Sequence, residues 1–273
     1  MKKHLKGFMV SLLVLGLSFT LAGCGGQANT STEGEKKADA TSSAPAITKI
    51  VVGSEAAYAP FEFVDVKTGE VVGFDAELIK AIGEAVGLEV EIKNTAWKGL
   101  IPGLEAGTLD AVISAMTITD ERKKSSDFSD PYFTAYQYFA VKEDSTIKID
   151  TDLVGKKVGV QTNTTGHYAA QKIKGMKDSD IKKFDTTPLA LIELQNGKVE
   201  AVVADSPVVL EFINKNPDAK IVAVDPKLPG KDEYGIAVKK GNTELLSKIN
   251  EGLKKVKESG KYDEIYTKYF GNK

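Results

Sequence analysis

The chain has 273 residues, of which 42% are hydrophobic and 27% are charged, and its formal net charge at pH 7 is −2. This length allows one large domain or two smaller lobes with a substantial core. The near-neutral balance, with no basic cluster beyond short lysine pairs, argues against a nucleic-acid-binding protein.

The N-terminus has the pattern of a secretory signal peptide. Three lysines within the first six residues precede an almost unbroken apolar stretch over residues 7–20, and Leu21-Ala22-Gly23-Cys24 follows. This pattern predicts a signal peptide over residues 1–23, too short and wrongly flanked for a membrane span. The Leu-Ala-Gly-Cys motif resembles the bacterial lipobox, which implies that Cys24 is lipidated and anchors the protein to the outer face of the cell membrane. Cys24 is the only cysteine, so no internal disulfide is expected.

The segment after the cysteine is expected to be a flexible tether. Residues 25–46 are small and polar and have no hydrophobic periodicity, so they cannot bury enough apolar surface to order themselves. Together with the lipidated cysteine, this predicts a tether over residues 24–46, and folding is expected to begin near Ile47.

From Ile47, strand-like and helix-like segments alternate, which indicates an α/β fold with a largely parallel sheet. Short β-branched runs predict strands, and apolar residues at helical spacing followed by glycine predict helices. In chain order, the first half is expected to contain a strand over 49–53, a helix over 75–86, a strand over 90–94, a short helix over 100–105 and a strand over 109–113.

The same pattern then recurs, which indicates two similar lobes. Residues 104–113 match residues 194–203 without a gap, from a helix end through a glycine into a strand. A general likeness between any two helix–glycine–strand units is the alternative explanation for this match. The second half is expected to contain strands over 157–160, 181–184 and 199–203 and helices over 165–172 and 189–195.

Two extended segments, 136–141 and 233–238, are expected to carry the chain between the lobes and to act as a hinge. The predicted boundaries are 47–137 plus 234–273 for lobe 1 and 138–233 for lobe 2. Apolar stripes near the C-terminus predict helices that pack back on lobe 1. In such α/β folds a ligand binds outside the carboxyl ends of the strands, which here means the cleft between the lobes.

The strand ends offer groups that match the zwitterion of an α-amino acid. One buried strand is followed by Ser114, Thr117 and Arg122, and a planar guanidinium can bind a carboxylate through two parallel hydrogen bonds. Thr119 is expected to be the N-cap of a helix at this point, and the helix dipole would add to anion affinity. The corresponding strand of the second lobe ends in Asp205, whose carboxylate can pair with an ammonium.

Simpler explanations are open for both charged residues. Arg122 could instead form a surface ion pair with Asp120 or Asp127, and the sequence favours neither explanation. An aspartate such as Asp205, which stands two residues before Pro207, is more often a helix cap than a ligand residue.

Two aromatic residues are expected near the same strand ends. Tyr58 follows the first strand, and Trp97, the only tryptophan, begins the helix after the second strand. Two facing rings would enclose an alkyl or guanidinium side chain between them. Core packing is an equal alternative for both residues and is the favoured role for Phe61.

In addition to the lipobox, several stretches of the chain resemble motifs of a known protein family. They are AYAPFEF with VVGFDAELI, SAMTITDERK with SDFSDPYF, VGVQTNTTG and VEAVVADSP. Together they resemble the polar-amino-acid family of periplasmic-type solute-binding proteins, which deliver ligands to ABC importers, and the resemblance covers essentially all of residues 47–270. It implies a periplasmic-binding-protein-like fold whose two lobes close on the ligand. It also implies a free L-amino acid, a membrane permease and its ATPase as partners.

The resemblance further implies ten ligand-binding residues, grouped by the part of the amino acid that they would contact. They are Arg122, Thr117 and Thr165 for the α-carboxylate, Asp205, Ser114 and the carbonyl of Ala115 for the α-ammonium, Tyr58 and Trp97 beside the side chain, and Glu55 and Gln161 at its tip.

Ligand preference depends on the residues at this tip. Family members that bind glutamine often have a lysine where this chain has Gln161, and binders of basic amino acids place an acid, often Asp, where it has Glu55. A buried carboxylate is costly unless a cation pairs with it. The sequence therefore predicts a basic amino acid such as arginine, lysine or ornithine. Glutamine is the alternative, because Glu55 is one methylene longer than the usual acid.

An enzyme is the rival class, because the architecture also resembles that of cyclohexadienyl dehydratases. The sequence offers no Ser/His/Asp or Cys/His set, no metal-ligand spacing, no Walker loop and no dinucleotide motif. His167 is the only histidine outside the signal, and it is expected to be solvated or to cap a helix. We therefore expect a monomeric binding protein without enzymatic activity, metal or cofactor.

Overall fold

The computed structural model describes residues 47–271. The predicted signal peptide over residues 1–23, and Cys24 with its tether over residues 24–46, lie outside these residues. Within the described part, no helix is both long and apolar enough to pass through a bilayer. Residues 47–271 form an α/β protein with two mixed five-stranded sheets.

In the first sheet four strands run in the same direction and one runs opposite to them. Its strands are β1 (Lys49–Ser54), β5 (Glu89–Asn94), β6 (Ala111–Val112), β7 (Ser126–Phe128) and β15 (Ala237–Lys239), in the order β5-β1-β6-β15-β7. β1 pairs in parallel with β5 and β6, whereas β15 runs antiparallel to β6 and β7. The β-branched residues of β1 suit a strand with neighbours on both sides.

The second sheet repeats this arrangement. Its strands are β9 (Gln137–Lys142), β10 (Val158–Gln161), β11 (Ile181–Phe184), β12 (Ala201–Asp205) and β13 (Ile221–Val224), in the order β11-β10-β12-β9-β13. β10 pairs in parallel with β11 and β12, and β9 runs antiparallel to β12 and β13. The two sheets therefore share one topology, as expected from the internal sequence match.

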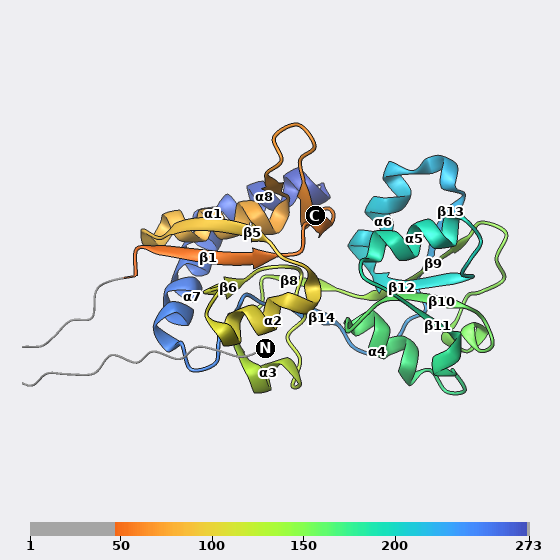
Figure 1. The fold of residues 1–273 in the computed structure, drawn as a ribbon. Helices are drawn as coiled ribbons and strands as arrows, with labels where there is room; N and C mark the ends of the chain where they lie inside the picture. The colour runs from red at the N-terminus through yellow and green to blue at the C-terminus, as the bar shows by residue number, and fades with distance from the viewer. Residues whose placement is uncertain (1–46, 272–273) are drawn as a thin grey trace, which may run out of the picture. The chain divides into compact units, whose positions relative to one another are not determined.

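A two-stranded ribbon carries the chain between the sheets. β8 (Phe133–Ala135) leads out of the first sheet, β14 (Asp232–Tyr234) leads back, and the two pair antiparallel. Figure 1 shows both strands in the region between the sheets. A separate small sheet consists of β2 (Ala57–Tyr58), β3 (Glu62–Val64) and β4 (Val71–Val72).

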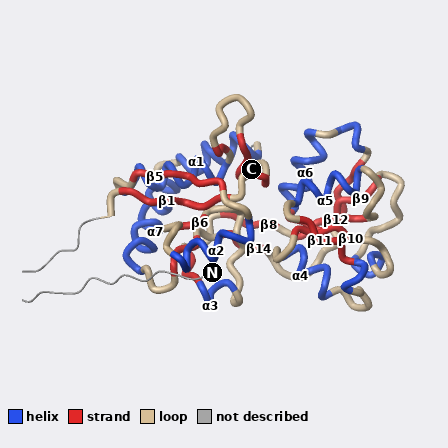
Figure 2. The backbone as a smooth tube through the Cα atoms, viewed as in Figure 1, coloured by secondary structure: helices blue, strands red, loops and turns tan. Residues whose placement is uncertain are grey.

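Helices cover the faces of both sheets and bury their apolar sides there. Figure 2 shows α5 and α6 on one side of the second sheet and α4 on the other. The C-terminal helices α7 and α8 share an apolar core with β1 and α1, so they pack back on the first sheet as predicted. The helices are α1 (Phe74–Val86), α2 (Trp97–Ala106), α3 (Arg122–Ser125), α4 (Thr165–Lys172), α5 (Thr187–Gln195), α6 (Ser206–Lys215), α7 (Thr243–Glu258) and α8 (Lys261–Phe270), with short 3-10 turns at Asp150–Leu153, Asp178–Asp180 and Pro217–Ala219.

The predicted strands and helices are present, and their ends differ by a few residues. Gly107 and Gly197 stand at the same place in the repeat and have φ values of 72° and 70°, a left-handed conformation that suits glycine after a helix. The small sheet, β7, β8 and β13 were not anticipated from the sequence, and α6 was considered only through the helix-cap explanation of Asp205. The exact division of the chain into lobes stays a prediction.

Candidate ligand-binding site

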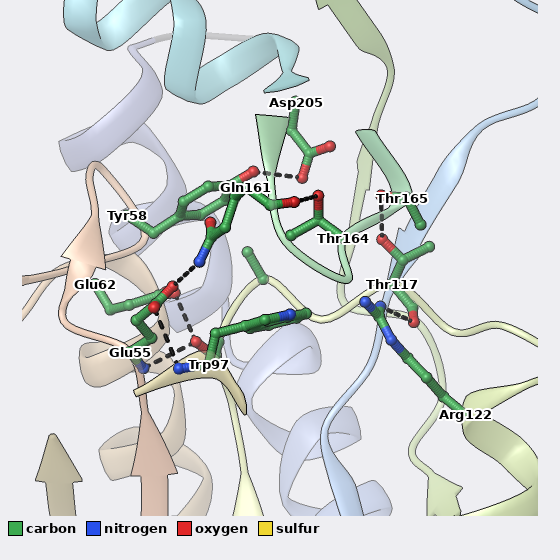
Figure 3. Close-up of a pocket in the computed structure, with 12 residues that line it drawn as sticks. Glu55, Tyr58, Glu62, Trp97, Thr117, Arg122, Gln161, Thr164, Thr165 and Asp205 are labelled. Carbon is green, nitrogen blue, oxygen red and sulfur yellow. Dashed lines mark hydrogen bonds between the residues drawn. The ribbon is translucent and has the colours of Figure 1, made fainter. Parts of the chain in front are cut away.

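The carboxyl ends of the parallel strands of both sheets surround one cavity. All ten residues predicted to contact a ligand line the cavity, and Glu62 and Thr164 line it with them. Figure 3 shows the labelled side chains around the cavity.

Arg122 is the cationic group of the cavity. Its guanidinium donates to the carbonyl of Thr117 at 2.7 Å and to the carbonyl of Asn163 at 3.4 Å, and its Cζ lies 5.0 Å from the centre of the Trp97 ring. Burial lowers the pKa of Arg122, although a guanidinium remains protonated in proteins. The surface ion pair considered from the sequence is wrong, since Asp127 pairs with Lys240 at 2.6 Å.

The backbone around Arg122 forms only a short helix where the sequence indicated a helix start. α3 is a single turn of four residues, and Glu121, not Thr119, stands at its N-cap position. The hydroxyl of Thr119 nevertheless accepts a hydrogen bond from the Arg122 N–H at 3.2 Å. A helix of four residues has almost no dipole of its own. The guanidinium therefore supplies the positive charge of this end of the cavity.

Thr165 faces Arg122 from the second sheet. It is the first residue of α4, where backbone N–H groups have no partner within the helix. Its hydroxyl lies 3.5 Å from that of Thr117, and it accepts a hydrogen bond from the amide of Gln137 at 3.2 Å. Together with Arg122, this helix start offers several donors to a carboxylate.

Asp205 is the anionic group at the other side of the cavity. The hydroxyls of Tyr58 and Tyr234 donate to its carboxylate at 2.8 and 2.5 Å, and the amide of Gln137 donates to it as well. Burial, and then the charge of Asp232, raises the pKa of Asp205 to about 6. The helix-cap explanation is wrong, because α6 has no side-chain cap and the carboxylate points into this hydrogen-bond network.

Ser114 and Ala115 follow shortly after β6, and both line the cavity. The Ser114 hydroxyl accepts the N–H of Glu55 at 3.0 Å and donates to Glu62 at 2.8 Å. A hydroxyl has two acceptor positions, so one remains for a ligand donor. Ala115 has a φ of 43°, an uncommon value for a residue other than glycine.

The two predicted aromatic residues belong to the cavity wall. Tyr58 lies on β2 and is 9% exposed, and its hydroxyl bond to Asp205 connects it to the opposite sheet. Trp97 is the first residue of α2, and its indole N–H donates to the carbonyl of Asn163 at 3.2 Å. Phe61, by contrast, is fully buried in the apolar core, as the sequence favoured.

Glu55 and Gln161 meet across the cavity. The Gln161 amide donates to Glu55 Oε2 at 2.6 Å, and the backbone N–H of Trp97 donates to Glu55 Oε1 at 3.2 Å. The Gln161 carbonyl oxygen in turn accepts from the hydroxyl of Thr187 at 3.0 Å.

Glu55 lacks a cationic partner within residues 47–271. Its burial, and more weakly the charge of Asp185, raises its pKa, while the hydrogen bonds from Gln161 and Trp97 oppose that shift. Lys98 lies in this region but pairs with Asp185, at 4.0 Å.

His167 does not line the cavity. It is 5% exposed, so of its two expected roles the solvated one is wrong. Its Nδ1 accepts the backbone N–H of Asn163, the residue before the N-cap Thr164, at 3.2 Å, which agrees with the capping role. Among the residues that the structure describes, no group of three or more His, Cys, Asp or Glu could hold a metal ion.

Sequence reasoning missed four polar residues of this region. Glu62 and Thr164 line the cavity, and Gln137 and Tyr234 hold Asp205. Glu62 lies within the AYAPFEF stretch and Thr164 within VGVQTNTTG, so both motifs contained the signal. Gln137 and Tyr234 begin and end strands at the crossing between the sheets, where no pattern indicates their partners.

Two similar α/β sheets around a polar cavity, with a cation and an anion on opposite sides, define a solute-binding protein. Residues 50–272 match the bacterial extracellular solute-binding proteins, family 3, and the chain belongs to this family. The family consists of binding proteins and not of enzymes, so the dehydratase alternative is set aside.

Known relatives resemble the chain over most of its length. A probable histidine-binding protein of Neisseria gonorrhoeae is 39% identical, over 93% of this chain and 91% of its own. A putative ABC transporter arginine-binding protein 2 of Escherichia coli K12 is 38% identical, over 84% and 93%. The crystal structure of the arginine-, lysine-, histidine-binding protein ArtJ of Geobacillus stearothermophilus is 48% identical and has a TM-score of 0.79, over 82% of this chain and 96% of its own.

Proposed function

We propose that the protein captures a basic amino acid such as arginine, lysine or ornithine outside the cytoplasm and delivers it to the permease of an ABC importer. The observation that carries this proposal is Glu55, a buried cavity carboxylate without a cationic partner among the described residues. A ligand cation would offset the desolvation cost of that carboxylate.

The other end of the cavity supports an α-amino acid. Arg122 and the start of α4 would bind the α-carboxylate, and Asp205 with Ser114 and the Ala115 carbonyl would bind the α-ammonium. The ligand side chain would then pass between Tyr58 and Trp97 toward Glu55 and Gln161. The relatives named above for arginine, lysine and histidine agree with a basic ligand.

Glutamine is the second candidate, and the hydrogen bonds of Glu55 favour it. Gln161 and the Trp97 N–H already donate to both oxygens of this carboxyl, so part of its hydrogen-bonding capacity is satisfied without a cation. The raised pKa of Glu55 also favours its protonated, neutral form, and a neutral carboxyl can donate a hydrogen bond to an amide oxygen.

Calorimetric titration with single amino acids distinguishes these candidates. A basic ligand predicts that a Glu55→Gln variant loses about 2 kcal/mol or more of binding free energy for arginine or lysine, a loss of roughly 30-fold. The same variant should change glutamine binding far less. Binding of glutamine by the wild type, with no response to arginine, lysine or ornithine, contradicts the proposal.

Two further parts of the proposal concern the cell surface and the two lobes. Lipidated Cys24 would hold a monomer on the outer face of the cell membrane through the tether, and equal membrane recovery of a Cys24→Ser variant would contradict this.

Lobe 1 (47–137 plus 234–273) and lobe 2 (138–233) would close on the ligand about the β8–β14 ribbon. The strands of this ribbon lie at both predicted boundaries, which supports the division.

A further inference from the structure

Two buried carboxyl groups lie side by side behind the candidate ammonium site. Glu62 comes from β3 and Asp75 from the first turn of α1, and both are fully buried. No lysine, arginine or histidine of residues 47–271 contributes to the shift in the pKa of Glu62 or of Asp75. A pair of this kind would be strongly repulsive if both members were ionised.

Each carboxyl holds a residue of the ligand-binding loop. Asp75 Oδ2 accepts the backbone N–H of Ala115 at 2.7 Å and the hydroxyl of Tyr132 at 2.7 Å. Glu62 Oε1 accepts the hydroxyl of Ser114 at 2.8 Å. Figure 3 shows Glu62 next to Glu55 at this side of the cavity.

The remaining oxygens indicate a shared proton. Glu62 Oε2 and Asp75 Oδ1 are buried and receive no hydrogen from any other group in the described part of the chain. Glu62 and Asp75 lie close together, since the Asp75 N–H donates to the carbonyl of Phe61, the residue before Glu62, at 2.9 Å, and their carboxyls hold the adjacent residues Ser114 and Ala115. A proton on one carboxyl would give both of these oxygens a partner. Burial, and then the charge of Asp75, raises the pKa of Glu62 well above its usual range, and burial raises that of Asp75 to about 6, so the pair disfavours a second negative charge.

The loop that this pair holds is under backbone strain. A left-handed alanine costs on the order of 1 kcal/mol, and such residues persist where their surroundings fix them. The bond from Asp75 fixes the N–H of Ala115, and thereby the direction of the neighbouring peptide groups. The bond from Glu62 fixes the hydroxyl of Ser114, which lines the cavity.

We propose that Glu62 and Asp75 are positioning residues that share one proton and together hold Ser114 and Ala115 in the geometry that binds the α-ammonium. This inference rests on the proposed function for the nature of the ligand, but the shared proton does not depend on it. The titratable groups that face the pair are Glu55 after β1, Tyr58 on β2, Tyr132 before β8 and Tyr262 on α8.

Amide substitutions test the shared proton, because an amide donates where a carboxylic acid does. In Glu62→Gln the amide can donate to Asp75, and in Asp75→Asn it can donate to Glu62. Each single variant should therefore weaken amino-acid binding by only about two- to tenfold, the value of one net hydrogen bond. The double variant brings two amide nitrogens together, so its loss should exceed the product of the single losses by about tenfold or more.

A matched control comes from the same helix. Glu77 also lies in the first turn of α1 but bonds to Lys268 and Tyr269 away from the cavity, so Glu77→Gln should leave affinity unchanged. Thermal unfolding of each variant establishes that it is folded before titration. Losses in the double variant that equal the product of the single losses would show two independent carboxyls and overturn the inference.

Infrared spectroscopy of the ligand-free protein provides an independent readout. At about pH 8, two units above the pKa values near 6, Asp75 and Asp205 are ionised. The wild type should then show a carboxylic-acid C=O band that shifts in D₂O and disappears in Glu62→Gln. A wild type without this band overturns the shared proton. If no amino acid binds the wild type, the proposed function fails. The carboxylic-acid band still tests whether Glu62 and Asp75 share a proton.

Discussion

At the scale of single residues, Asp205 makes ligand binding dependent on pH. Burial and the charge of Asp232 raise its pKa to about 6. A bound ammonium would favour the carboxylate and lower that pKa. Binding should therefore release a proton at pH values between the pKa of Asp205 in the ligand-bound protein and its pKa in the free protein. Affinity should therefore fall as the pH falls through about 6, and it should be nearly constant above about pH 8, where Asp205 is ionised in both states.

Calorimetry in two buffers with different protonation enthalpies measures this release directly. The apparent binding enthalpy should differ between the buffers near pH 6 and agree near about pH 8. Because Glu55 also has a raised pKa, a Glu55→Gln variant serves as the control, and the release from Asp205 should persist in it. Equal enthalpies in both buffers near pH 6 would show that Asp205 does not change its protonation on binding.

The residues that could be predicted from the sequence are those that act directly at a strand end. Arg122 and Asp205 follow buried strands, and the rule that ligands bind at the carboxyl ends of strands placed them together. Glu62 and Asp75 could not be assigned in this way, because their role depends on meeting behind Ser114. That meeting follows from the packing of β3 and α1, which no local pattern encodes.

At the scale of elements, the start of α4 connects helix stability to ligand affinity. The Thr164 hydroxyl accepts the N–H of His167 at 3.2 Å and donates to the carbonyl of Gln161 at 2.8 Å. Thr164→Ala should cost about 1 kcal/mol of unfolding free energy, as is usual for an N-cap. Because Thr165 follows directly, amino-acid affinity should also fall, by up to about fivefold, the factor that 1 kcal/mol represents.

A second capped helix provides the comparison for this prediction. The side chain of Asn242 caps α7 by accepting the N–H of Leu245 at 3.2 Å, and α7 contributes no residue to the cavity. Asn242→Ala should lower stability by a similar amount, measured by denaturant unfolding, and leave affinity unchanged. An equal loss of affinity in both variants would show that Thr164 acts only through global stability.

The elements were more predictable than their lengths. Hydrophobic periodicity and terminal glycines indicated α1, α2 and α5, and the internal match anticipated the shared topology of the two sheets. Thr119 was expected to be the N-cap of a helix at this point, and the chain forms the four-residue α3 there before it turns into β7. The pairing of β7 with β15 is a long-range interaction that overrides the local preference.

At the scale of the whole molecule, direct hydrogen bonds cross the cavity between residues on the side of the first sheet and residues on the side of the second. Glu55 bonds to Gln161, Tyr58 to Asp205, and Trp97 to the carbonyl of Asn163, at 2.6, 2.8 and 3.2 Å. These contacts are few, and each involves a cavity residue that the proposed ligand would also contact. A ligand that bridges both sides therefore favours the arrangement in which the sides are close, in proportion to its differential affinity for that arrangement.

Small-angle X-ray scattering tests this coupling between ligand and conformation. The radius of gyration should decrease when a saturating amino acid is added, because the ligand shifts the population toward the arrangement in contact. Asp205→Asn removes the negative partner of the ammonium while keeping the side-chain shape, so the same ligand concentration should compact it much less. An unchanged radius of gyration for the ligand-saturated wild type would contradict closure. The permease would then have to recognise the ligand, or a local change around the cavity, instead of the relative position of the two sheets.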